Sequence, residues 1–594
     1  MKSKEAIRNQ ILTYTNLIWD TKKIERMDLL VRMMIEELTN ELYLVQNKLN
    51  DIDMLLLEKI AKKLTPAQYV SIRPAHTVLQ ITPNLPVLML DKETPFFSND
   101  IPTEVISEKA DAIAFYPIAE TCLLNLKINY QFHDKQLYAI DANGRKELVF
   151  KTERQSTFNT VWLGLEVDEQ VKDLKGLAFY IDFPGLSEIH DYYEVLPYTT
   201  CFIGGREVEL IPEFPVHSKT SMSGCERDIL RIYQDHYLTI SESVPTTRIQ
   251  AEKLPEELSE LIDPEAVGDL KPMYWVQLQF RPNFTTKDLG RALIAVNTIP
   301  VLNKKFRKIK ISREQLNKTA VLPSDVGEKL LSIDAVMDQK LNTYVQDMEV
   351  GNNDQGTYHL EVFNPIFAED QTLADHMEQL LDLIDEERVA FPHIDKDQIE
   401  QIMTSITKTD EESSKKVNRN IKTDSSETGW ILVNPHEYAT TVKVDYWVTY
   451  GELINGIAAG GTFIPHKTSS LDGLVAMSLC EIHGGKEFTE IEDVMLINRY
   501  IFTSKDRIIT EHNIKCFCQS ELGRALDKVE IELGGKISPK PKEGLIRVIN
   551  LKLTPSIEYP EMIYRKGVLK DLKVRLEQRS PDSYNYVIQV IDNL

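Results

Sequence analysis

The residues best suited to chemistry are His512, Cys516 and Cys518, which stand as His-x3-Cys-x-Cys in the sequence. Imidazole nitrogens and thiolate sulfurs are preferred ligands of zinc and other soft metal ions. A tetrahedral site needs a fourth ligand, and the nearest candidates, Cys480 and His483, do not stand at a paired spacing. We therefore interpret the cysteines as ordinary thiols of a β-strand, and the sequence predicts no metal ligands.

A glycine-rich segment at 451–461 is the second place where a ligand could be held. A phosphate-binding loop needs Gly-Lys-Ser/Thr, whereas Thr462 follows the last glycine here, and the spaced glycines of a dinucleotide site are also missing. We interpret the segment as a turn packed against its neighbours. The sequence contains no nucleophile elbow, His-Glu-x-x-His motif or kinase motif either. We predict no catalytic residue, no cofactor and no enzymatic activity.

The composition is that of a folded protein with several domains. The 594 residues are too many for one hydrophobic core and predict about three or four domains. The formal charge of −23, from 68 basic and 91 acidic residues, argues against a general binder of nucleic acid or anionic membranes. No apolar run approaches the roughly 20 residues of a membrane span. The first residues lack an apolar signal core and the six cysteines are scattered, so we expect a cytoplasmic protein.

The N-terminal segment, residues 1–66, is predicted to be helical because no proline precedes Pro66 and no glycine precedes Gly144. Apolar residues recur at alternating steps of four and three from Val31 to Leu56, which is an a/d heptad seam. One interpretation is a helical hairpin that covers the protein's own core. We favour a bundle shared with other subunits. The central positions of the seam are Leu38, Leu42, Val45 and Leu49.

The sequence of the remaining residues predicts mostly antiparallel β domains followed by a C-terminal α+β module. We therefore expect a multidomain α+β fold. Residues 67–250 carry short β-type runs separated by turns, with a helix inserted near 187–196. Residues 251–407 read as a mixed α/β domain that ends in amphipathic helices at 371–387 and 395–406. Residues 408–429 contain too few apolar side chains to form a core, so we expect a flexible linker there. The C-terminal module, 430–594, is expected to have helices near 469–479, 490–502 and 568–578 and strands at 441–448, around 508, and at 529–532, 545–554 and 584–591.

The most specific pattern lies at 294–306, where an apolar run meets Pro300 and ends in basic residues. Proline has no backbone donor, so Pro300 indicates an edge, a bulge or an end of a buried strand. The order Asn-x-x-Pro-Val-x-Asn, made by Asn297, Pro300, Val301 and Asn303, resembles a segment of TssF, a family of type VI secretion baseplate subunits. Four other segments are similar to the family in the same order: the heptad helix with the strand and prolines up to residue 86, 114–118, 174–196 and 321–336.

Two features distinguish this chain from the family pattern. After the motif, Lys304-Lys305 stand where the family usually has Leu-Phe, so the chain resembles a divergent branch such as the type VI systems of Bacteroidetes. The basic run continues to Arg313, and its simplest interpretation is a solvated strand face. We nevertheless expect a branch-specific partner contact at Lys304 and Lys305.

The block from Glu487 onward resembles the C-terminal part of baseplate-J-like wedge proteins of contractile phage tails.

The resemblance implies an architectural role. A TssF subunit assembles with TssG and a second copy of itself into a wedge. Wedges bind TssK and TssE, surround the VgrG spike hub, anchor the tail at the inner-membrane-associated baseplate, and initiate tube and sheath assembly. One alternative is a wedge subunit of an extracellular contractile injection system or a phage tail. Alternatives of other classes are a metal-binding enzyme that uses His512, Cys516 and Cys518, and a generic binding module.

Overall fold

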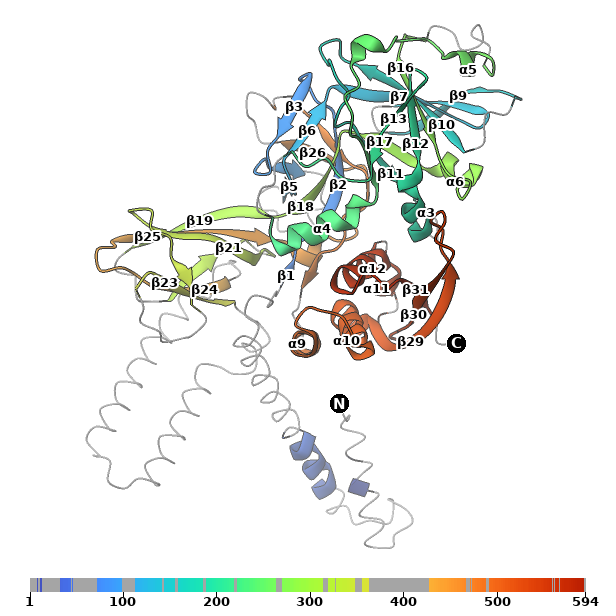
Figure 1. Cartoon of the computed structure of the whole chain (residues 1–594). Coiled ribbons are helices and arrows are strands. Elements are labelled where there is room, and N and C mark those ends of the chain that lie inside the picture. Colours follow the sequence, from blue (N-terminus) through green and yellow to red (C-terminus); the bar gives the residue numbers. More distant parts are fainter. Residues whose placement is uncertain are drawn as a thin grey trace, which may run out of the picture.

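The computed structural model describes residues 8, 11–12, 33–43 and 45, and then 72–362 and 427–591 except 99–112, 142–143, 155–158, 185–188, 218–221, 263–269, 313–318, 326, 348–354, 466–470, 472, 488–490, 558, 560 and 566. These residues form an α+β protein whose sheets are mostly antiparallel, which confirms that part of the prediction (Figure 1). Most of the predicted N-terminal helices, the helices at 371–387 and 395–406, and nearly all of the linker at 408–429 lie outside the described residues. No described helix is long and apolar enough to cross a membrane.

A closed barrel forms where distant parts of the chain meet. Its strands, in order around the barrel, are β18 (Thr298–Asn303), β2 (His76–Ile81), β27 (Ala476–Ser478), β26 (Thr462–Pro465), β4 (Phe96–Ser98) and β5 (Ile113–Pro117). Every residue of β18 is buried, which explains why its central residues, Ile299–Leu302, are all apolar and do not alternate with polar ones. Val78, Phe115 and Phe463 contribute to one apolar cluster together with Val301 of β18.

Pro300 lies within β18 and not at its end. The pairing of β18 with β2 covers Thr298–Leu302, whereas the pairing with β5 begins only at Val301. The carbonyl of Pro300 accepts a hydrogen bond from the amide of Ile118, 3.2 Å away, just beyond the end of β5. A strand tolerates proline at such a position because the hydrogen-bond ladder on that side ends there.

Two antiparallel sheets beside the barrel share one apolar core. The seven-stranded sheet runs β13 (Arg206–Val208), β12 (Thr200–Ile203), β16 (Tyr274–Gln279), β10 (Thr160–Val167), β7 (Leu126–His133), β8 (Gln136–Ile140) and β9 (Lys146–Lys151). The four-stranded sheet runs β14 (Leu210–Ile211), β15 (Tyr237–Ile240), β11 (Ala178–Asp182) and β17 (Leu293–Val296). Leu163 and Val276 of the first sheet lie in the same cluster as Phe179 and Ile294 of the second, so the two sheets form a sandwich.

Short helices connect these strands. They are α3 (Ile189–Val195), η3 (Leu196–Tyr198), α4 (Gly224–Gln234), η4 (Thr246–Arg248), α5 (Glu256–Ser259) and α6 (Thr286–Arg291). The helix predicted near 187–196 corresponds to α3 and η3. Ser223 begins α4 with a capping box, because its hydroxyl accepts from the amide of Glu226 and the Glu226 carboxylate accepts from the amide of Ser223.

Two smaller sheets lie to one side of the barrel (Figure 1). One is β19 (Lys305–Ser312), β25 (Thr441–Thr449) and β21 (Lys329–Asp338); the other is β20 (Thr319–Pro323), β24 (Glu427–Asn434), β23 (Thr357–Val362) and β22 (Val345–Gln346). They share a core that includes Ile311, Ile431 and Val444. Two strand pairs complete the β structure: β1 (Ile72–Arg73) with β28 (Lys486–Glu487), and β3 (Val87–Leu90) with β6 (Thr121–Leu124).

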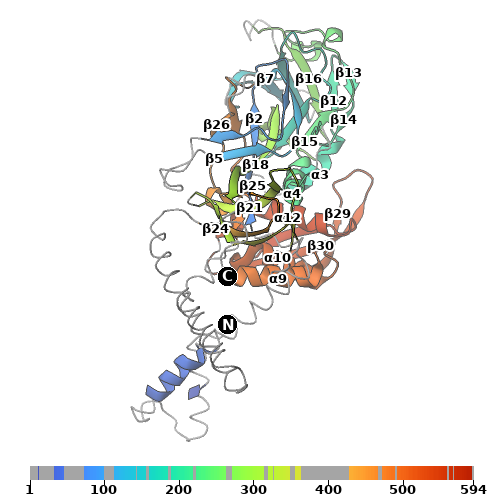
Figure 2. The same cartoon turned by 90° about the vertical axis from the view of Figure 1, so that its left-hand side faces the viewer.

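The C-terminal module consists of helices packed on one face of a three-stranded sheet. It contains α9 (Ile491–Ser504), α10 (Glu511–Leu522), η7 (Gly523–Ala525), β29 (Leu526–Ile537), β30 (Leu545–Pro555), α11 (Glu561–Tyr564), α12 (Val568–Arg579) and β31 (Tyr586–Val590). The predicted helices near 490–502 and 568–578 and the last three predicted strands correspond to α9, α12, β29, β30 and β31. Figures 1 and 2, turned by 90°, both show this module beside α4, against which α12 packs.

Two predicted elements of this region were wrong. The strand expected around Ile508 is a loop that leads into α10, because Thr510 caps the helix by accepting from the amide of Asn513 at 3.2 Å. The helix expected near 469–479 is instead β27, whose residues 476–478 pair with β2 and β26 inside the barrel. Tertiary pairing overrides the local helical pattern there.

The module also begins later in the chain than residue 430. β24 and β25 pair with strands of 305–362, β26 and β27 close the barrel, and β28 pairs with β1. Residues 427–487 therefore complete sheets that residues 72–362 begin. Within the described residues, the C-terminal module proper runs from 491 to 591.

Candidate functional site

The first asparagine of the motif joins β17 and β18 to the neighbouring strands β6 and β7. Asn297 has a φ of 55°, in the left-handed region that asparagine tolerates better than most residues. Its side-chain nitrogen donates to the carbonyls of Leu124 at 2.7 Å and Leu126 at 2.9 Å, and its side-chain oxygen accepts from the amide of Leu124 at 3.2 Å. The side chain thus pairs backbone groups at the junction of two strands, which would otherwise be buried without partners.

The last asparagine of the motif joins three parts of the chain. The side-chain nitrogen of Asn303 donates to the carbonyl of Ala114 in β5 at 3.0 Å. Its side-chain oxygen accepts from the backbone amide of Tyr450 at 2.8 Å and from the hydroxyl of Thr449 at 2.9 Å. Asn303 is 1% exposed, so it connects the barrel to the end of β25 from a buried position.

Lys304 and Lys305 form ion pairs within the chain, which differs from the exposed basic exit that the sequence predicts. Lys304 is buried, with its nitrogen 3.0 Å from a carboxylate oxygen of Glu226 and 4.4 Å from the ring centroid of Trp447. The nitrogen of Lys305 lies 3.2 Å from Asp325 and 3.3 Å from Glu328. The reason is that both lysines stand where β18 continues into β19 beside acidic residues that are remote in sequence. Of the rest of the basic run, Lys308 and Lys310 are exposed.

The described part of the heptad seam is a helix at 33–43 and 45. Ile35 is buried against Leu12 and Ile11, so the chain covers this edge of the seam itself. Leu38, Leu42 and Val45 are 51%, 43% and 50% exposed. Leu49 lies outside the described residues. The apolar stripe therefore continues beyond the part that this chain buries, and a partner surface here remains a proposal.

His512, Cys516 and Cys518 lie on α10 and not on a strand. His512 Nε2 is 3.4 Å from the sulfur of Cys516, one helical turn away, whereas Cys518 is two residues further on and therefore faces another side of the helix. Both cysteines are buried and His512 is exposed. Burial raises the pKa of the Cys518 thiol, which disfavours the thiolate that a metal would need.

The glycine-rich segment lies close to its neighbours, as a packed turn would. Gly451 begins η6 (Gly451–Ile454) with a φ of 52°, and a Cβ atom added there would lie 2.9 Å from the side chain of Glu487. A Cβ atom on Gly485 would approach the carbonyl oxygen of Gly451 to 2.1 Å. Close backbone approach therefore explains the absence of a side chain at these positions.

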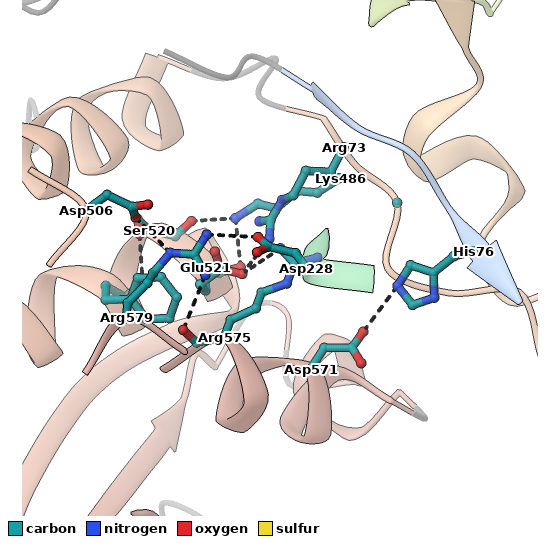
Figure 3. A network of polar contacts seen from close by, with 12 residues as sticks. Arg73, His76, Asp228, Lys486, Asp506, Ser520, Glu521, Asp571, Arg575 and Arg579 are labelled. Atoms are coloured by element: carbon teal, nitrogen blue, oxygen red, sulfur yellow. Dashed lines mark hydrogen bonds and ion pairs between the residues drawn. The ribbon is translucent and has the colours of Figure 1, made fainter. Parts of the chain in front are cut away.

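A buried network of ionic and polar contacts holds the C-terminal module against the rest of the chain (Figure 3). Arg73 of β1 donates to the carboxylate of Glu521 in α10 at 2.7 Å. Lys486 of β28 donates to the carbonyls of Ser520 and Glu521 at 2.5 and 2.7 Å. Arg579, at the end of α12, donates to Asp228 of α4 at 2.9 Å.

The electrostatics of this network favour the ionised carboxylate. Burial alone would raise the pKa of Glu521, but Arg73 and Lys486 together hold this pKa below its ordinary value. Burial, with the repulsion of Arg73, lowers the pKa of Lys486 to about 8. Glu521 is therefore the carboxylate that Arg73 and Lys486 share, and its loss would remove a favourable negative charge from this partly buried cluster.

Sequence reasoning did not find this network. Arg73 and Glu521 are separated by 448 residues, and neither stands in a motif. The one available signal was Arg73 itself, a basic residue just before the first predicted strand. That signal does not identify a partner.

No protein-family model and no characterised protein sequence matches the chain. Solved structures that are similar to it include a chain of the type VI secretion system TssK–TssF–TssG baseplate subcomplex, with 10% identity and a TM-score of 0.45 over 95% of this chain and 96% of that one. A chain of the baseplate complex from the type VI secretion system is similar over 99% of this chain and 96% of that one, with 9% identity and a TM-score of 0.37.

Proposed function

We propose that this chain is a structural wedge subunit of a contractile baseplate of the type VI secretion kind, with a TssF-like role. The proposal rests first on the five segments that resemble TssF in the same order along the sequence. TssG and TssK are the partners that this role requires most directly. TssE, the VgrG spike hub and a second copy of the chain complete the proposed assembly at the inner-membrane-associated baseplate.

One observation carries the proposal beyond the resemblance. Asn297 and Asn303, the two asparagines of the motif, are buried, and their amides pair with backbone groups from β5, β6, β7 and the end of β25. A buried amide whose donor and acceptor are both bonded to the backbone fixes strand geometry and has no access to a substrate. The two asparagines of the motif therefore act structurally, as the proposed role requires.

The proposed partner surface is the exposed part of the N-terminal stripe. Leu38, Leu42 and Val45 project from a helix whose neighbouring Ile35 is already covered by the chain itself. An amphipathic helix of this kind gains stability by burying the rest of its apolar face in a bundle. TssG, together with a second copy of the chain, is the proposed occupant.

Co-purification with the TssG-type subunit of the same organism tests this proposal. Leu38→Asp should abolish co-purification, because a charge would enter the buried seam of the bundle. Met33→Asp is the matched control: Met33 lies on the same helix, is 66% exposed, and stands outside the seam. Equal co-purification of both variants would contradict the proposed surface.

A further inference from the structure

Three potential metal ligands from distant parts of the chain converge beside the network of Figure 3. They are His76 of β2, His483 just before β28, and Asp571 of α12; Figure 3 shows His76 and Asp571 of this group. His76 and His483 form an isolated antiparallel bridge, which sets their rings 4.5 Å apart between centroids. The potential ligand atoms of all three residues lie within 4.8 Å of one another.

The hydrogen bonds of the two histidines allow both Nε2 atoms to act as acceptors. Nδ1 of His483 lies 2.8 Å from the carbonyl of Glu481, and because a carbonyl only accepts, this nitrogen carries the proton. In the neutral ring, Nε2 is then an acceptor. Nδ1 of His76 bonds the hydroxyl of Tyr233, which can donate or accept, at 2.8 Å. With the proton on Nδ1 of His76, its Nε2, which has no hydrogen-bond partner among the described residues, is an acceptor as well.

The acceptors face a carboxylate at distances that a hydrogen bond does not span. Nε2 of His76 lies 3.8 Å from an oxygen of Asp571, and Nε2 of His483 lies 3.7 Å from the same oxygen. Hydrogen bonds of this type close to about 3 Å. Ligands at the usual bond lengths from one zinc ion stand roughly 3.4–3.6 Å apart, which is close to the observed separations.

Burial makes the convergence costly unless a cation compensates it. His76 is 0% exposed and Asp571 is 7% exposed, and the second carboxylate oxygen of Asp571 has no hydrogen-bond partner among the described residues. Arg73 of the network is paired with Glu521 at 2.7 Å.

A cleft reaches two of the three proposed ligands, and glycines pack closely against both imidazole rings. His483 and Asp571 line a cleft of about 190 Å³, which could also provide a water as a fourth ligand. Gly484 and Gly567 stand beside the two rings. A Cβ atom on Gly484 would lie 2.1 Å from Nε2 of His76, and one on Gly567 would lie 2.6 Å from Cδ2 of His483.

We propose that His76, His483 and Asp571 bind a Zn²⁺ ion that fixes the C-terminal module to the barrel. β2 belongs to the barrel, the segment of His483 leads into β28, and α12 belongs to the module. One ion with a ligand from each would cross-link them. The hydroxyl of Tyr233 and the carbonyl of Glu481 orient the two imidazoles, as groups behind metal ligands generally do.

Metal analysis of the full chain, purified through a tag without histidines, tests this proposal. After incubation with ZnCl₂ and dialysis, we expect about one Zn²⁺ per chain. His483→Gln should remove the ion, whereas His512→Gln, which changes the exposed histidine of α10, should retain it. Wild-type protein without bound zinc would overturn the proposal, as would equal zinc in both variants.

A second pair of variants keeps the test decisive if His483→Gln does not fold. Tyr233→Phe removes only the hydroxyl that orients His76, and should weaken zinc binding by about 10- to 100-fold in a chelator competition. Tyr237→Phe is the matched control, because Tyr237 is also fully buried and its hydroxyl interacts with Thr298 and not with a proposed ligand. Equal zinc affinity in these two variants would also contradict the site.

Discussion

The side-chain oxygen of Asn303 accepts a hydrogen bond from the backbone amide of Tyr450, 2.8 Å away and 147 residues further along the chain. This contact ties the end of β18 to the end of β25, while the nitrogen of the same side chain holds β5. A single buried amide thus fixes the position of one smaller sheet relative to the barrel. The proposed function of the subunit is to hold partner proteins in place. Such contacts would then set the relative positions of the surfaces to which the partners bind.

Replacing Asn303 by alanine should destabilise this junction by about 3 kcal/mol, because the amide of Tyr450 and the carbonyl of Ala114 lose their buried partner. Hydrogen exchange at the amide of Tyr450 measures the effect locally. Asn129→Ala is the control, since Asn129 is only partly buried and bonds a half-exposed Glu166; we expect less than about 1 kcal/mol there. Slow, unchanged exchange at Tyr450 in Asn303→Ala would refute this role.

The left-handed backbone of Asn297 predicts an unusual order of stability. Asn297→Ala and Asn297→Gly both lose the hydrogen bonds to Leu124 and Leu126. Alanine is destabilised further, because its Cβ atom makes the left-handed φ of 55° unfavourable. Asn297→Gly should therefore be the more stable of the two by about 1 kcal/mol. At Asn303, which lies in regular strand backbone, glycine should be the less stable by a similar amount. Urea denaturation followed by tryptophan fluorescence, to which Trp447 beside Tyr116 of the barrel contributes, gives both orders. The same order at both positions would show that φ is not responsible.

The ion pairs of Glu226 predict a pH dependence of stability. Burial alone would raise the pKa of Glu226, but Lys304 at 3.0 Å and Lys92 at 2.7 Å hold it below the ordinary value of 4.5. A carboxyl with a lowered folded-state pKa stabilises the fold above its unfolded value, and this contribution is lost as the pH falls through the folded-state pKa. Glu226→Gln, which retains a capping side chain, should thus cost on the order of 3 kcal/mol at pH 7 and little in acid well below pH 4.5.

Hydrogen exchange of α4 amides at several pH values measures this difference. The control is Glu242→Gln, because Glu242 pairs with an arginine that is 65% exposed; its cost should stay below about 1 kcal/mol. A penalty for Glu226→Gln that does not change with pH would mean that ionisation of Glu226 does not stabilise the fold.

Glu521 should control how firmly the C-terminal module is held. Glu521→Gln removes the negative charge that Arg73 and Lys486 share, so we expect the opening of α10 and α12 to become easier by about 2 kcal/mol. Limited proteolysis should then release the module before it cuts the sandwich strands β10 and β16. Glu511→Gln, which breaks the exposed pair with Lys515, should leave the cleavage pattern unchanged. Simultaneous cleavage of module and sandwich would argue against a local hinge at this network.

Local patterns predicted much of the secondary structure. The apolar run at 294–303 is buried as predicted, but it forms two strands, β17 and β18, that separate at Asn297 and not at Pro300. The periodic segments at 490–502 and 568–578 are helices, because the pattern of apolar residues has a helical period. The error at 508–518 arose because the cap formed by Thr510 and Asn513 was not recognised before an irregular apolar pattern.

Long-range pairing could not be predicted in the same manner. Residues 476–478 form a strand only because β2 and β26 flank them, and Lys304 is buried only because Glu226 of α4 lies opposite. Similarly, His483 was weighed only as a fourth ligand for His512, Cys516 and Cys518, whereas the potential ligands that lie beside it are His76 and Asp571. Such contacts depend on the folded topology, and one sequence carries no local signal for them.

The most direct test of the proposed role is the composition of the particle obtained when the full chain is co-expressed with the TssG-type subunit of the same organism. With a tag on that subunit and analysis by size-exclusion chromatography with light scattering, we expect both proteins to elute together at a mass above that of either alone. The double variant Leu38→Asp, Leu42→Asp should leave the two proteins apart. Separate elution of the two folded wild-type proteins would contradict the wedge-subunit role.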